Sequence, residues 1–373
     1  MTTRHAARRI RVLLLSRYGR LGSSSRLRSL QYLPYLEAHG FEIEVHSLLD
    51  DQYVRRLNSG NRQSAGRIAS AYIARASRIV LRRRWDLVWI EREAFPWVPA
   101  SLELAWLRQC EVPYVLEMDD AVYLRYSDHS SRLVRAALDA KIDRLMRDAE
   151  LVIGGSECIA ERAIGAGARW VERLPTVVDL ARYSSQLGAP RPGLTIGWIG
   201  SPTTAPFLNL VAEPLRRLCD RYNDIRLVVV GANAPPMHGV LVACKEWSEH
   251  TEADDVGEFD VGIMPLPDSP FARGKCGHKL IQYMACGKPV VASPVGENNV
   301  IVTAGVNGLL AGSCKEWVDQ IDLLYRDPAL RFRLGAAGRK MVEEHFSLQV
   351  TAPRLAEMLG RAAAGAGSRH RKP

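Results

Sequence analysis

The sequence predicts an α/β protein built from two domains, each a parallel sheet covered by helices on both faces. The chain has 373 residues, which is enough for two domains of ordinary size. In both halves, short apolar runs alternate with amphipathic helical segments, as in repeated βαβ units. Residues 184–193 contain Gly, Pro and Ser in the proportions of a linker. We therefore expect one domain on each side of this linker.

The expected boundaries follow from these patterns. An N-terminal Rossmann-like domain is predicted at 1–183 and a C-terminal Rossmann-like domain at 194–346, with a last helix at 347–361. The final segment, 362–373, is basic and rich in Gly and Ala, so we expect it to be disordered.

Composition narrows the class of protein. Hydrophobic residues make up 47% of the chain, which is typical of a globular protein, and no apolar run approaches the length of a membrane span. The seven cysteines contain no Cys-x-x-Cys pair, so we expect a reduced cytoplasmic protein with neither a zinc site nor a disulfide framework. The net charge of +9 favours an anionic partner, such as a nucleotide, a lipid headgroup or nucleic acid. No basic stripe with interleaved aromatic residues supports nucleic acid.

The first domain opens with a βαβ unit. Ile10–Leu15 is expected to be a strand, followed by a Gly/Ser loop, a helix to about His39 and a second strand at 41–47. Gly19 and Gly22 in the loop do not match Gly-x-Gly-x-x-Gly, so the fingerprint of dinucleotide-binding proteins is absent. The loop is either a tight βα turn or a ligand-binding segment.

Residues 62–84 are expected to form a basic amphipathic helix. At about 100° per residue, four arginines fall within a sector of about 80°: Arg67, Arg75, Arg78 and Arg82. Such a helix can pack its apolar arc on the core as an ordinary surface helix. It can also lie on an anionic membrane. The sequence leaves both interpretations open.

Two adjacent carboxylates follow a strand in the middle of the first domain. Further strands are expected at 86–90, at 114–117 and within 151–156, where the strand ends in a loop. Asp119 and Asp120 come just after the second of these, at the sheet edge where α/β proteins bind ligands. We expect the two side chains to point in different directions, so that one faces a ligand. An acceptor-site carboxylate and a helix cap both fit this position. His129 lies further along the same loop region.

The second domain begins with a strand at 194–199. The loop that follows, from Gly200 onward, carries hydroxyl groups rather than cations, among them Ser201 and Thr203. Later elements are expected as strands at 225–231 and within 240–247, a solvated acidic turn at 249–258, and helices at 315–326 and 328–345.

The most informative stretch is 259–312. A strand at 260–265 leads into a basic loop and a short helix, and Arg273, Lys275 and Lys279 surround the start of that helix. Short strands are expected after it at 290–292 and within 306–310. The N–H groups of the first turn and the helix dipole favour an anion at the helix start. We expect the three cations to converge on a phosphate group.

Residues 282–293 read Gln-Tyr-Met-Ala-Cys-Gly-Lys-Pro-Val-Val-Ala-Ser. This stretch resembles the donor-binding core of the family-4 retaining glycosyltransferases (glycosyl transferases group 1). The usual pattern of that family has a Glu, seven residues, a second Glu, and then Ala-Met-Ala-Cys-Gly-x-Pro-Val-Val-Ala-Ser. Here Gly274 and Gln282 stand at the two Glu positions, so neither carboxylate is present. The resemblance extends from about residue 10 to 361.

The resemblance implies a fold and an activity. The fold would be GT-B, with two Rossmann-like domains facing each other across a cleft and the last helix crossing back toward the first domain. The activity would be hexosyltransferase-like. A sugar would pass with retention from a nucleotide-sugar donor to a glycan or lipid-linked acceptor, in cell-envelope or polysaccharide biosynthesis. Related enzymes typically need no metal and no further cofactor. A cytoplasmic location, or one on the cytoplasmic face of a membrane, would follow.

The resemblance also implies roles for individual residues. Lys279, Lys275 or Arg273 would stabilise the leaving diphosphate, because electrostatic stabilisation of developing charge is usually the largest catalytic term. Asp119 and Asp120 would serve the acceptor side. The remaining donor-binding candidates are Gly22, Ser23, Gly200, Ser201, Thr203, Gln282, Gly296 and Glu297.

Several alternatives remain open at this point. Gln282 is either a hydrogen-bonding partner of a hydroxyl or a packing residue, and Glu297 either accepts from a ribose or begins a helix. Because both motif carboxylates are missing, the chain is alternatively a catalytically silent homologue that binds a nucleotide or a partner. A nucleotide-sugar epimerase on the same fold is a third hypothesis.

Overall fold

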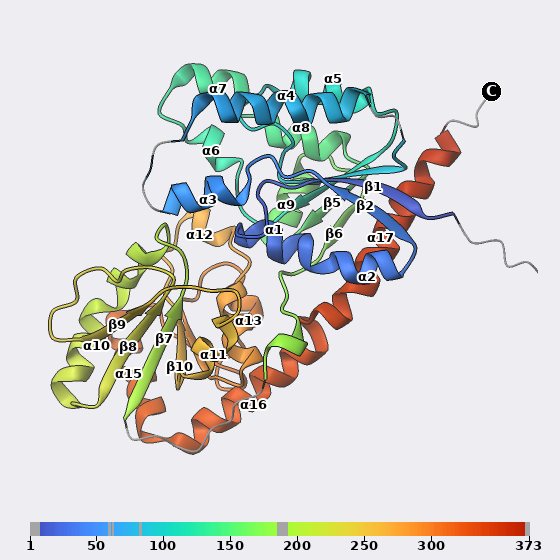
Figure 1. Cartoon of the computed structure of the whole chain (residues 1–373). Helices are drawn as coiled ribbons and strands as arrows, with labels where there is room; N and C mark the ends of the chain where they lie inside the picture. Colours follow the sequence, from blue (N-terminus) through green and yellow to red (C-terminus); the bar gives the residue numbers. More distant parts are fainter. Residues whose placement is uncertain (1–7, 59–60, 62, 82–83, 185–192, 370–373) are drawn as a thin grey trace, which may run out of the picture. The chain divides into compact units, whose positions relative to one another are not determined.

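The computed structural model describes residues 8–58, 61, 63–81, 84–184 and 193–369. Contacts divide the chain into two compact units. Unit 1 comprises Met1–Thr176 and Thr351–Pro373, and unit 2 comprises Val177–Val350. Each unit contains a six-stranded sheet with helices on both faces (Figure 1). The paired strands are parallel in both sheets. The predicted α/β class with two Rossmann-like sheets is confirmed.

The sheet of unit 1 has the order β2-β1-β3-β4-β5-β6. Its strands are β1 (Ile10–Leu15), β2 (Phe41–Val45), β3 (Leu87–Glu91), β4 (Tyr114–Met118), β5 (Leu151–Gly154) and β6 (Val171–Arg173). The sequences of β1, β3, β4 and β5 are largely apolar. Strands β3 and β4 are buried along their whole length, as expected for parallel strands between two helical layers. The strand order reverses at β1, so the switch point lies between β1 and β3.

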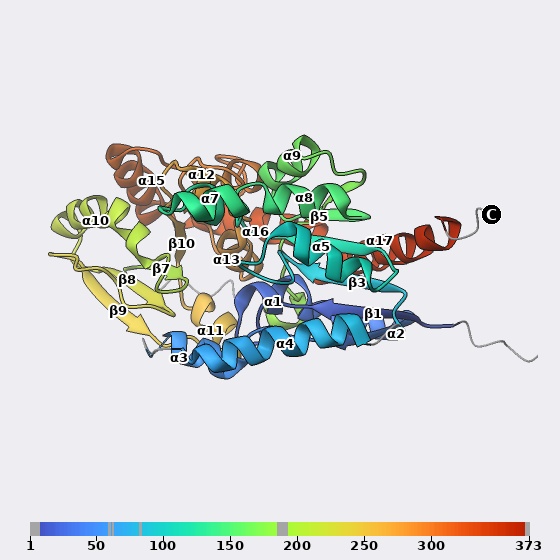
Figure 2. The ribbon, with the colours of Figure 1, turned by 90° about the horizontal axis from the view of Figure 1, so that it is seen from above.

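Helices cover both faces of this sheet (Figures 1 and 2). The helices of unit 1 are α1 (Ser23–Arg28), α2 (Leu33–Ala38), α3 (Asp51–Asn58), α4 (Ala65–Leu81), α5 (Ala100–Arg108), α6 (Leu124–Ser127), α7 (Arg132–Leu138), α8 (Lys141–Asp148) and α9 (Glu157–Gly165), with the 3₁₀ turn η1 (Leu30–Tyr32). Apolar residues of α4, α5 and α8 form one core with the sheet. On the other face lie α1, α2 and the helix α17 (Leu348–Arg369).

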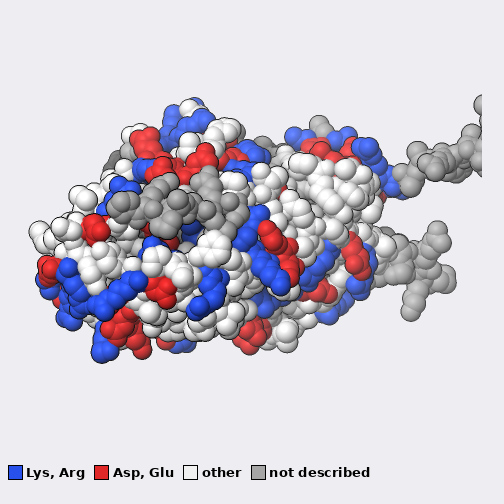
Figure 3. Space-filling view, turned by 90° about the horizontal axis from the view of Figure 1, so that it is seen from below, with Lys and Arg blue, Asp and Glu red and all other residues white. Residues whose placement is uncertain are grey.

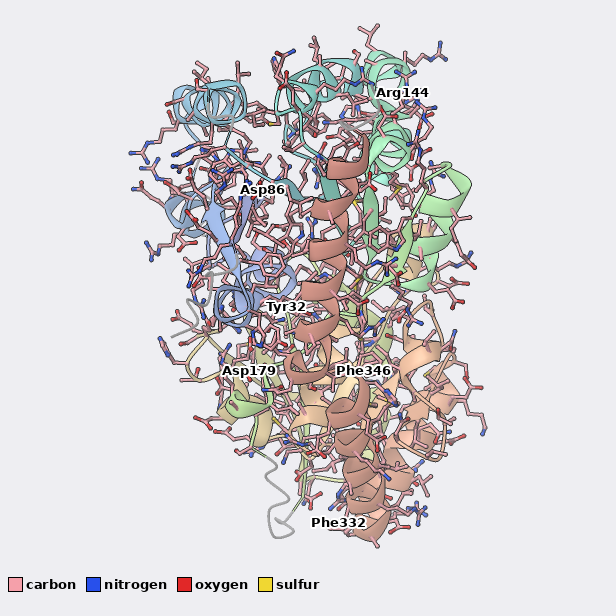
Figure 4. All side chains as sticks on the ribbon, turned by 90° about the vertical axis from the view of Figure 1, so that its right-hand side faces the viewer. Tyr32, Asp86, Arg144, Asp179, Phe332 and Phe346 are labelled. Carbon is pink, nitrogen blue, oxygen red and sulfur yellow. The ribbon has the colours of Figure 1, made fainter. Side chains whose placement is uncertain are left out.

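Helix α17 begins in unit 2 and continues through the last part of unit 1. Within unit 1, the Tyr32 hydroxyl lies 3.1 Å from Thr351 Oγ1, which fixes this helix against η1 (Figure 4). The helix extends to Arg369, beyond the predicted end at 361. Most of the tail that was expected to be disordered is therefore helical, and 370–373 lie outside the described residues.

Two local predictions for unit 1 need correction. The helix expected to run from the first loop to His39 is broken into α1, η1 and α2. Pro34 lies in the first turn of α2, where its missing N–H is tolerated, but it could not continue an uninterrupted helix. The predicted helix at 62–84 is present as α4, yet its arginines do not form one exposed sector.

Arg75 is the clearest departure, because its side chain is fully buried. Its guanidinium donates to the backbone carbonyls of Ser16 and Ala94, at 2.6 and 3.0 Å. Arg78 pairs with Glu44, and Arg82 lies outside the described residues. Of the four arginines, Arg67 is exposed and donates to Gln52. These contacts favour an ordinary packed helix over a membrane-binding face.

The sheet of unit 2 has the order β12-β11-β10-β7-β8-β9, so its switch point lies between β7 and β10. Its strands are β7 (Leu194–Ile199), β8 (Ile225–Val230), β9 (Leu241–Lys245), β10 (Val261–Met264), β11 (Val290–Ala292) and β12 (Leu309–Leu310). All were expected from the sequence. The linker predicted at 184–193 falls mostly on 185–192, outside the described residues.

Two helical layers also cover this second sheet. The helices are α10 (Asn209–Arg221), α11 (Glu252–Gly257), α12 (Pro270–Arg273), α13 (His278–Ala285), α14 (Asn298–Ile301), α15 (Cys314–Arg326) and α16 (Pro328–His345), with 3₁₀ turns η2 (Leu180–Arg182) and η3 (Ala205–Leu208). Apolar residues of α10 and α15 form one core with the sheet. The acidic segment predicted as a solvated turn contains α11, whose Glu252 is buried.

On the face seen in Figure 3, basic and acidic side chains are interspersed. No helix in the described parts of the chain is long and apolar enough to cross a membrane.

Candidate functional site

In unit 2, the switch point of the sheet brings the predicted phosphate-binding lysine to the end of the first strand. Ligands in such sheets bind outside the carboxyl ends of the strands at the switch point. The Lys279 ammonium, from the first turn of α13, lies 4.8 Å from the ring centroid of Trp198 in β7. A cation over an indole face is a favourable arrangement. Lys279 is therefore held beside the loop that follows β7.

Gly200, the first residue after β7, makes this approach sterically feasible. A Cβ at this position would lie 2.6 Å from Lys279 Nζ and 2.5 Å from Trp198 Cη2. Ser201 and Thr203 in the same loop are exposed, and the Ser201 carbonyl accepts from Thr204 N at 3.0 Å. The loop thus carries exposed hydroxyl groups, and its first residue lies where a side chain would overlap both Lys279 and Trp198.

The three cations around the start of α13 have different partners. Arg273 is exposed and makes two bonds to Asp268, at 2.6 and 2.9 Å. Lys275 Nζ lies 4.4 Å from the ring centroid of Phe271. Each of these two cations therefore contacts a side chain of its own neighbourhood, as Lys279 contacts Trp198. Gly277, at φ 65°, separates the loop that carries Lys275 from the helix that carries Lys279.

Gln282 lies in a buried hydrogen-bond chain. Its Nε2 donates to the Tyr183 hydroxyl at 3.1 Å, and that hydroxyl donates to Glu252 Oε1 at 2.6 Å. Trp247 Nε1 donates to the other oxygen of Glu252, at 2.7 Å. Burial and the neighbouring Glu252 raise the pKa of Tyr183 well above its usual value, so the hydroxyl remains a donor. This arrangement supports the packing interpretation of Gln282.

The remaining candidates of unit 2 lie in the loop after β11. Gly296 has φ 54°, and a Cβ there would lie 2.5 Å from the Arg273 carbonyl oxygen. Glu297 is buried at the start of α14, where its carbonyl accepts from Ile301 N at 3.0 Å. Gly274, at the first motif position, is the C-cap of α12 and is buried. These positions join α12 and the loop after β11 into one tightly packed edge.

In unit 1, a buried carboxylate anchors the loop after β1 through two hydrogen bonds. Glu91 Oε2, at the end of β3, accepts from Arg17 N at 3.0 Å and from Ser25 Oγ at 2.6 Å. Gly22 precedes α1, and a Cβ there would lie 2.3 Å from the Cβ of Tyr18. Gly22 and Ser23 thus lie at the switch point of unit 1, in a turn that requires a glycine.

Asp119 and Asp120 both accept hydrogen bonds from the guanidinium group of Arg92. Arg92 makes two bonds to Asp119, at 2.6 and 2.8 Å, and one to Asp120 Oδ2, at 3.3 Å. The expectation that the two carboxylates point in different directions is not confirmed. Burial alone would raise the pKa of Asp119, but the charge and hydrogen bonds of Arg92 outweigh it and lower the pKa. Asp119 is therefore ionised and fixed, while Asp120 is the more exposed of the two.

The sequence reasoning missed a buried ionic network beneath these residues. Lys141 is fully buried and pairs with Glu93 at 2.7 Å and with Glu103 at 2.9 Å. Arg28 pairs with Glu117 at 2.6 Å, and both are buried. Burial raises the pKa of Glu117 to about 8, with Arg28 acting in the opposite direction. The available signal was the placement of charged residues inside or directly after apolar runs.

Among the described residues, no group of three or more His, Cys, Asp or Glu side chains is placed to hold a metal ion.

Comparison with known proteins finds similarity to glycosyltransferases. Residues 193–327 match the sequence profile described as glycosyl transferases group 1. A D-inositol 3-phosphate glycosyltransferase from Frankia alni is 26% identical over 288 residues, covering 65% of this chain and 68% of that protein. The enzyme of the same name from Kribbella flavida is 28% identical over 179 residues, covering 43% of this chain and 42% of that protein.

Solved structures show the same fold. HepE from Anabaena, in complex with UDP-glucose, has a TM-score of 0.70 and 16% identity, covering 94% of this chain and 100% of that chain. A sucrose-phosphate synthase from Thermosynechococcus elongatus has a TM-score of 0.67 and 16% identity, covering 96% and 100%.

The two sheets and these structural likenesses define a GT-B fold. Within this fold, residues 193–327 are similar to the group 1 glycosyl transferases.

Proposed function

We propose that the chain transfers a sugar from a nucleotide-sugar donor to a glycan or lipid-linked acceptor, with retention at the anomeric carbon and without a metal ion. The setting proposed is cell-envelope or polysaccharide biosynthesis on the cytoplasmic side. The observation that carries the proposal is the position of Lys279, which lies over Trp198 and beside Gly200 at the switch point of unit 2. A lysine there suits the diphosphate of a nucleotide sugar.

Lys279 would act on the leaving group. As the bond between the anomeric carbon and the phosphate oxygen breaks, negative charge grows on the diphosphate. An ammonium group already in place lowers the free energy of that state more than that of the bound donor. Amide groups at the start of α13 add to the same effect. The acceptor oxygen would attack the anomeric carbon on the same face from which the diphosphate leaves, and the leaving phosphate would take the acceptor's proton. This route retains the configuration without a protein nucleophile.

The nucleotide is proposed to bind to unit 2. HepE, a structural neighbour, was solved with UDP-glucose and also with UDP and glucose. UDP-sugars are therefore the first donors to test. We do not propose a membrane contact through α4, because Arg75 is buried and Arg78 is paired with Glu44.

A screen of UDP-, GDP-, ADP- and TDP-sugars by thermal shift and calorimetry tests the donor site. We expect one nucleotide class to stabilise the protein and Lys279→Ala to weaken its binding by at least about tenfold, as for loss of a charge-assisted contact. Lys315→Ala is the matched control, since Lys315 is 85% exposed and pairs on the surface with Asp319. Donor binding equal in both variants would contradict the role of Lys279.

The alternative function is a catalytically silent homologue, favoured by the absence of carboxylates at Gly274 and Gln282 and by the buried hydrogen bonds of Gln282. Hydrolysis of the bound donor in the absence of acceptor separates the two. Measurable release of nucleotide supports an enzyme, and donor binding without any turnover supports the silent homologue.

A further inference from the structure

Two residues between β3 and α5 adopt a backbone conformation that is rare for residues other than glycine. Arg92 has φ 63° and Trp97 has φ 64°. Such conformations cost free energy and occur preferentially at functional sites. Both residues belong to the segment 92–99, which follows β3 at the switch point of unit 1. The segment is therefore a candidate for ligand recognition.

Trp97 is 48% exposed, yet several contacts fix its position. Its ring packs edge-on against Tyr126, with the centroids 5.3 Å apart, and against His129 at 5.7 Å. The Trp97 backbone N–H donates to the Tyr126 hydroxyl at 3.1 Å, and that hydroxyl donates to buried Glu93 at 2.7 Å. These contacts hold a half-exposed indole in one orientation, which suits a stacking surface.

Oppositely charged side chains of the two neighbouring segments, 92–99 and 119–131, are paired with each other. Arg92 is bonded to Asp119 and Asp120, and Arg125 Nη1 lies 3.5 Å from Glu93 Oε1. Asp120 is the most accessible carboxylate of this group, with 28% of its side chain exposed. A carboxylate accepts hydrogen bonds from sugar hydroxyls, whereas it repels a phosphate group.

We propose that the segment 92–99 and the facing loop 119–131 bind the ring of a neutral sugar, which stacks on Trp97 and donates a hydroxyl to Asp120. This proposal rests on the proposed glycosyl transfer and assigns the class of its acceptor: an uncharged glycan terminus. It differs from the acceptor that the name of the curated relatives denotes, D-inositol 3-phosphate.

The test is a transfer assay that follows the confirmation of donor binding. With the donor that stabilises the protein, nucleotide release is measured with methyl glycosides of glucose, galactose, mannose and N-acetylglucosamine. The same assay is run with their 6-phosphates and with D-inositol 3-phosphate. We expect neutral glycosides to accelerate nucleotide release and the phosphorylated compounds to have little effect.

Variants connect this result to the site. Trp97→Ala should raise the KM for the neutral acceptor about tenfold while the donor Kd stays unchanged, and Trp97→Phe should retain most of the affinity. Leu133→Ala is the control, because Leu133 is an apolar residue of unit 1 that is 83% exposed. Asp120→Asn preserves the side-chain size. It should weaken the neutral acceptor and improve binding of D-inositol 3-phosphate.

The outcomes separate this proposal from the proposed function. Absence of donor binding would contradict glycosyl transfer itself. Donor binding combined with use of phosphorylated acceptors alone, or with no use of any neutral glycoside, would overturn the acceptor proposal. An unchanged KM in a folded Trp97→Ala variant would overturn it as well. Neutral-acceptor activity that is lost in Trp97→Ala and kept in Leu133→Ala supports it.

Discussion

The two units differ in the partners that they provide for charged side chains near the ends of their strands. In unit 1, cations near the ends of the strands are paired with buried carboxylates, as in Arg92–Asp119 and Lys141–Glu93. In unit 2, the lysine at the corresponding position lies over an indole ring, beside a glycine that has no room for a side chain. The first arrangement suits uncharged hydroxyl groups, and the second suits a phosphate. Under the two proposals above, the same sheet architecture serves two different kinds of ligand.

Removing a charged residue should also have different energetic consequences in the two units. Removing one partner from a buried pair leaves an uncompensated charge, which costs far more than the pair contributes. The contact between Lys279 and Trp198 is of another kind, a cation against a neutral ring, so removal of this lysine should affect ligand binding more than folding. Variants can test both halves of this contrast.

The largest effect is expected for Lys141→Ala. This change leaves Glu93 and Glu103 buried without their shared cation, at a cost of about 3–5 kcal/mol. The midpoint of thermal unfolding, followed by circular dichroism, should fall by about 10 °C. Lys315→Ala should leave the midpoint unchanged. A small effect of Lys141→Ala would mean that the network is not needed for the stability of unit 1.

Glu117→Gln should change the dependence of stability on pH. The folded-state pKa of Glu117 is about 8, above its usual value of 4.5, so the folded protein holds this proton while the unfolded chain releases it. The stabilising contribution is complete below pH 4.5 and is lost as pH rises toward 8, with a slope of about 1.4 kcal/mol per pH unit.

Glutamine resembles the protonated side chain and does not titrate. Relative to wild type, the Glu117→Gln variant should therefore gain stability steadily as pH rises from about 5 to 8. Urea unfolding at several pH values measures this difference. Parallel curves for the two proteins would show that Glu117 is ionised across the range, held by Arg28 against the effect of burial.

The positions of most strands along the chain and the α13–β11 region could be predicted because the relevant patterns are local. Apolar runs identify buried strands, and Gly287 with Pro289 marks the end of α13. The burial of Arg75 could not be predicted in this way. A helical projection groups side chains by angle but does not say which sector faces the core, and the carbonyl acceptors of Arg75 come from distant segments.

Only the parts of the candidate site that depend on local sequence could be predicted. The importance of Lys279 follows from a local motif, but its contact with Trp198 depends on the pairing of β10 with β7. The partners of Gln282 are equally distant, since Tyr183 precedes the second sheet and Glu252 lies in α11. Trp97 has no sequence signature at all. Its left-handed conformation and its contacts appear only in the folded chain.

Gln282→Glu tests whether restoring a motif carboxylate restores a function or damages the fold. Tyr183 has one hydroxyl hydrogen and donates it to Glu252, so an ionised carboxylate in place of the Gln282 amide would face the Tyr183 oxygen without a donor. We expect a loss of about 1–3 kcal/mol in the free energy of unfolding, without tighter donor binding. Gln349→Glu is the control, because the exposed Gln349 also donates to a partner, Asp179, at 2.8 Å. Tighter donor binding by the Gln282→Glu variant would instead support the ligand-binding interpretation.

Gly200→Ala gives the smallest expected change and the most direct test of the contrast between the units. The added methyl would lie within 2.6 Å of both Lys279 Nζ and the edge of the buried Trp198 ring, so both side chains must shift and the contact between them is disturbed. We expect donor affinity to fall about tenfold in calorimetry, as for the loss of one charge-assisted contact. Gly165→Ala, at a helix position where a Cβ meets nothing within 4 Å, should leave donor affinity unchanged. If Gly200→Ala binds donor normally while Lys279→Ala does not, the ammonium reaches the donor from elsewhere. The contact with Trp198 would then describe a resting position of the side chain.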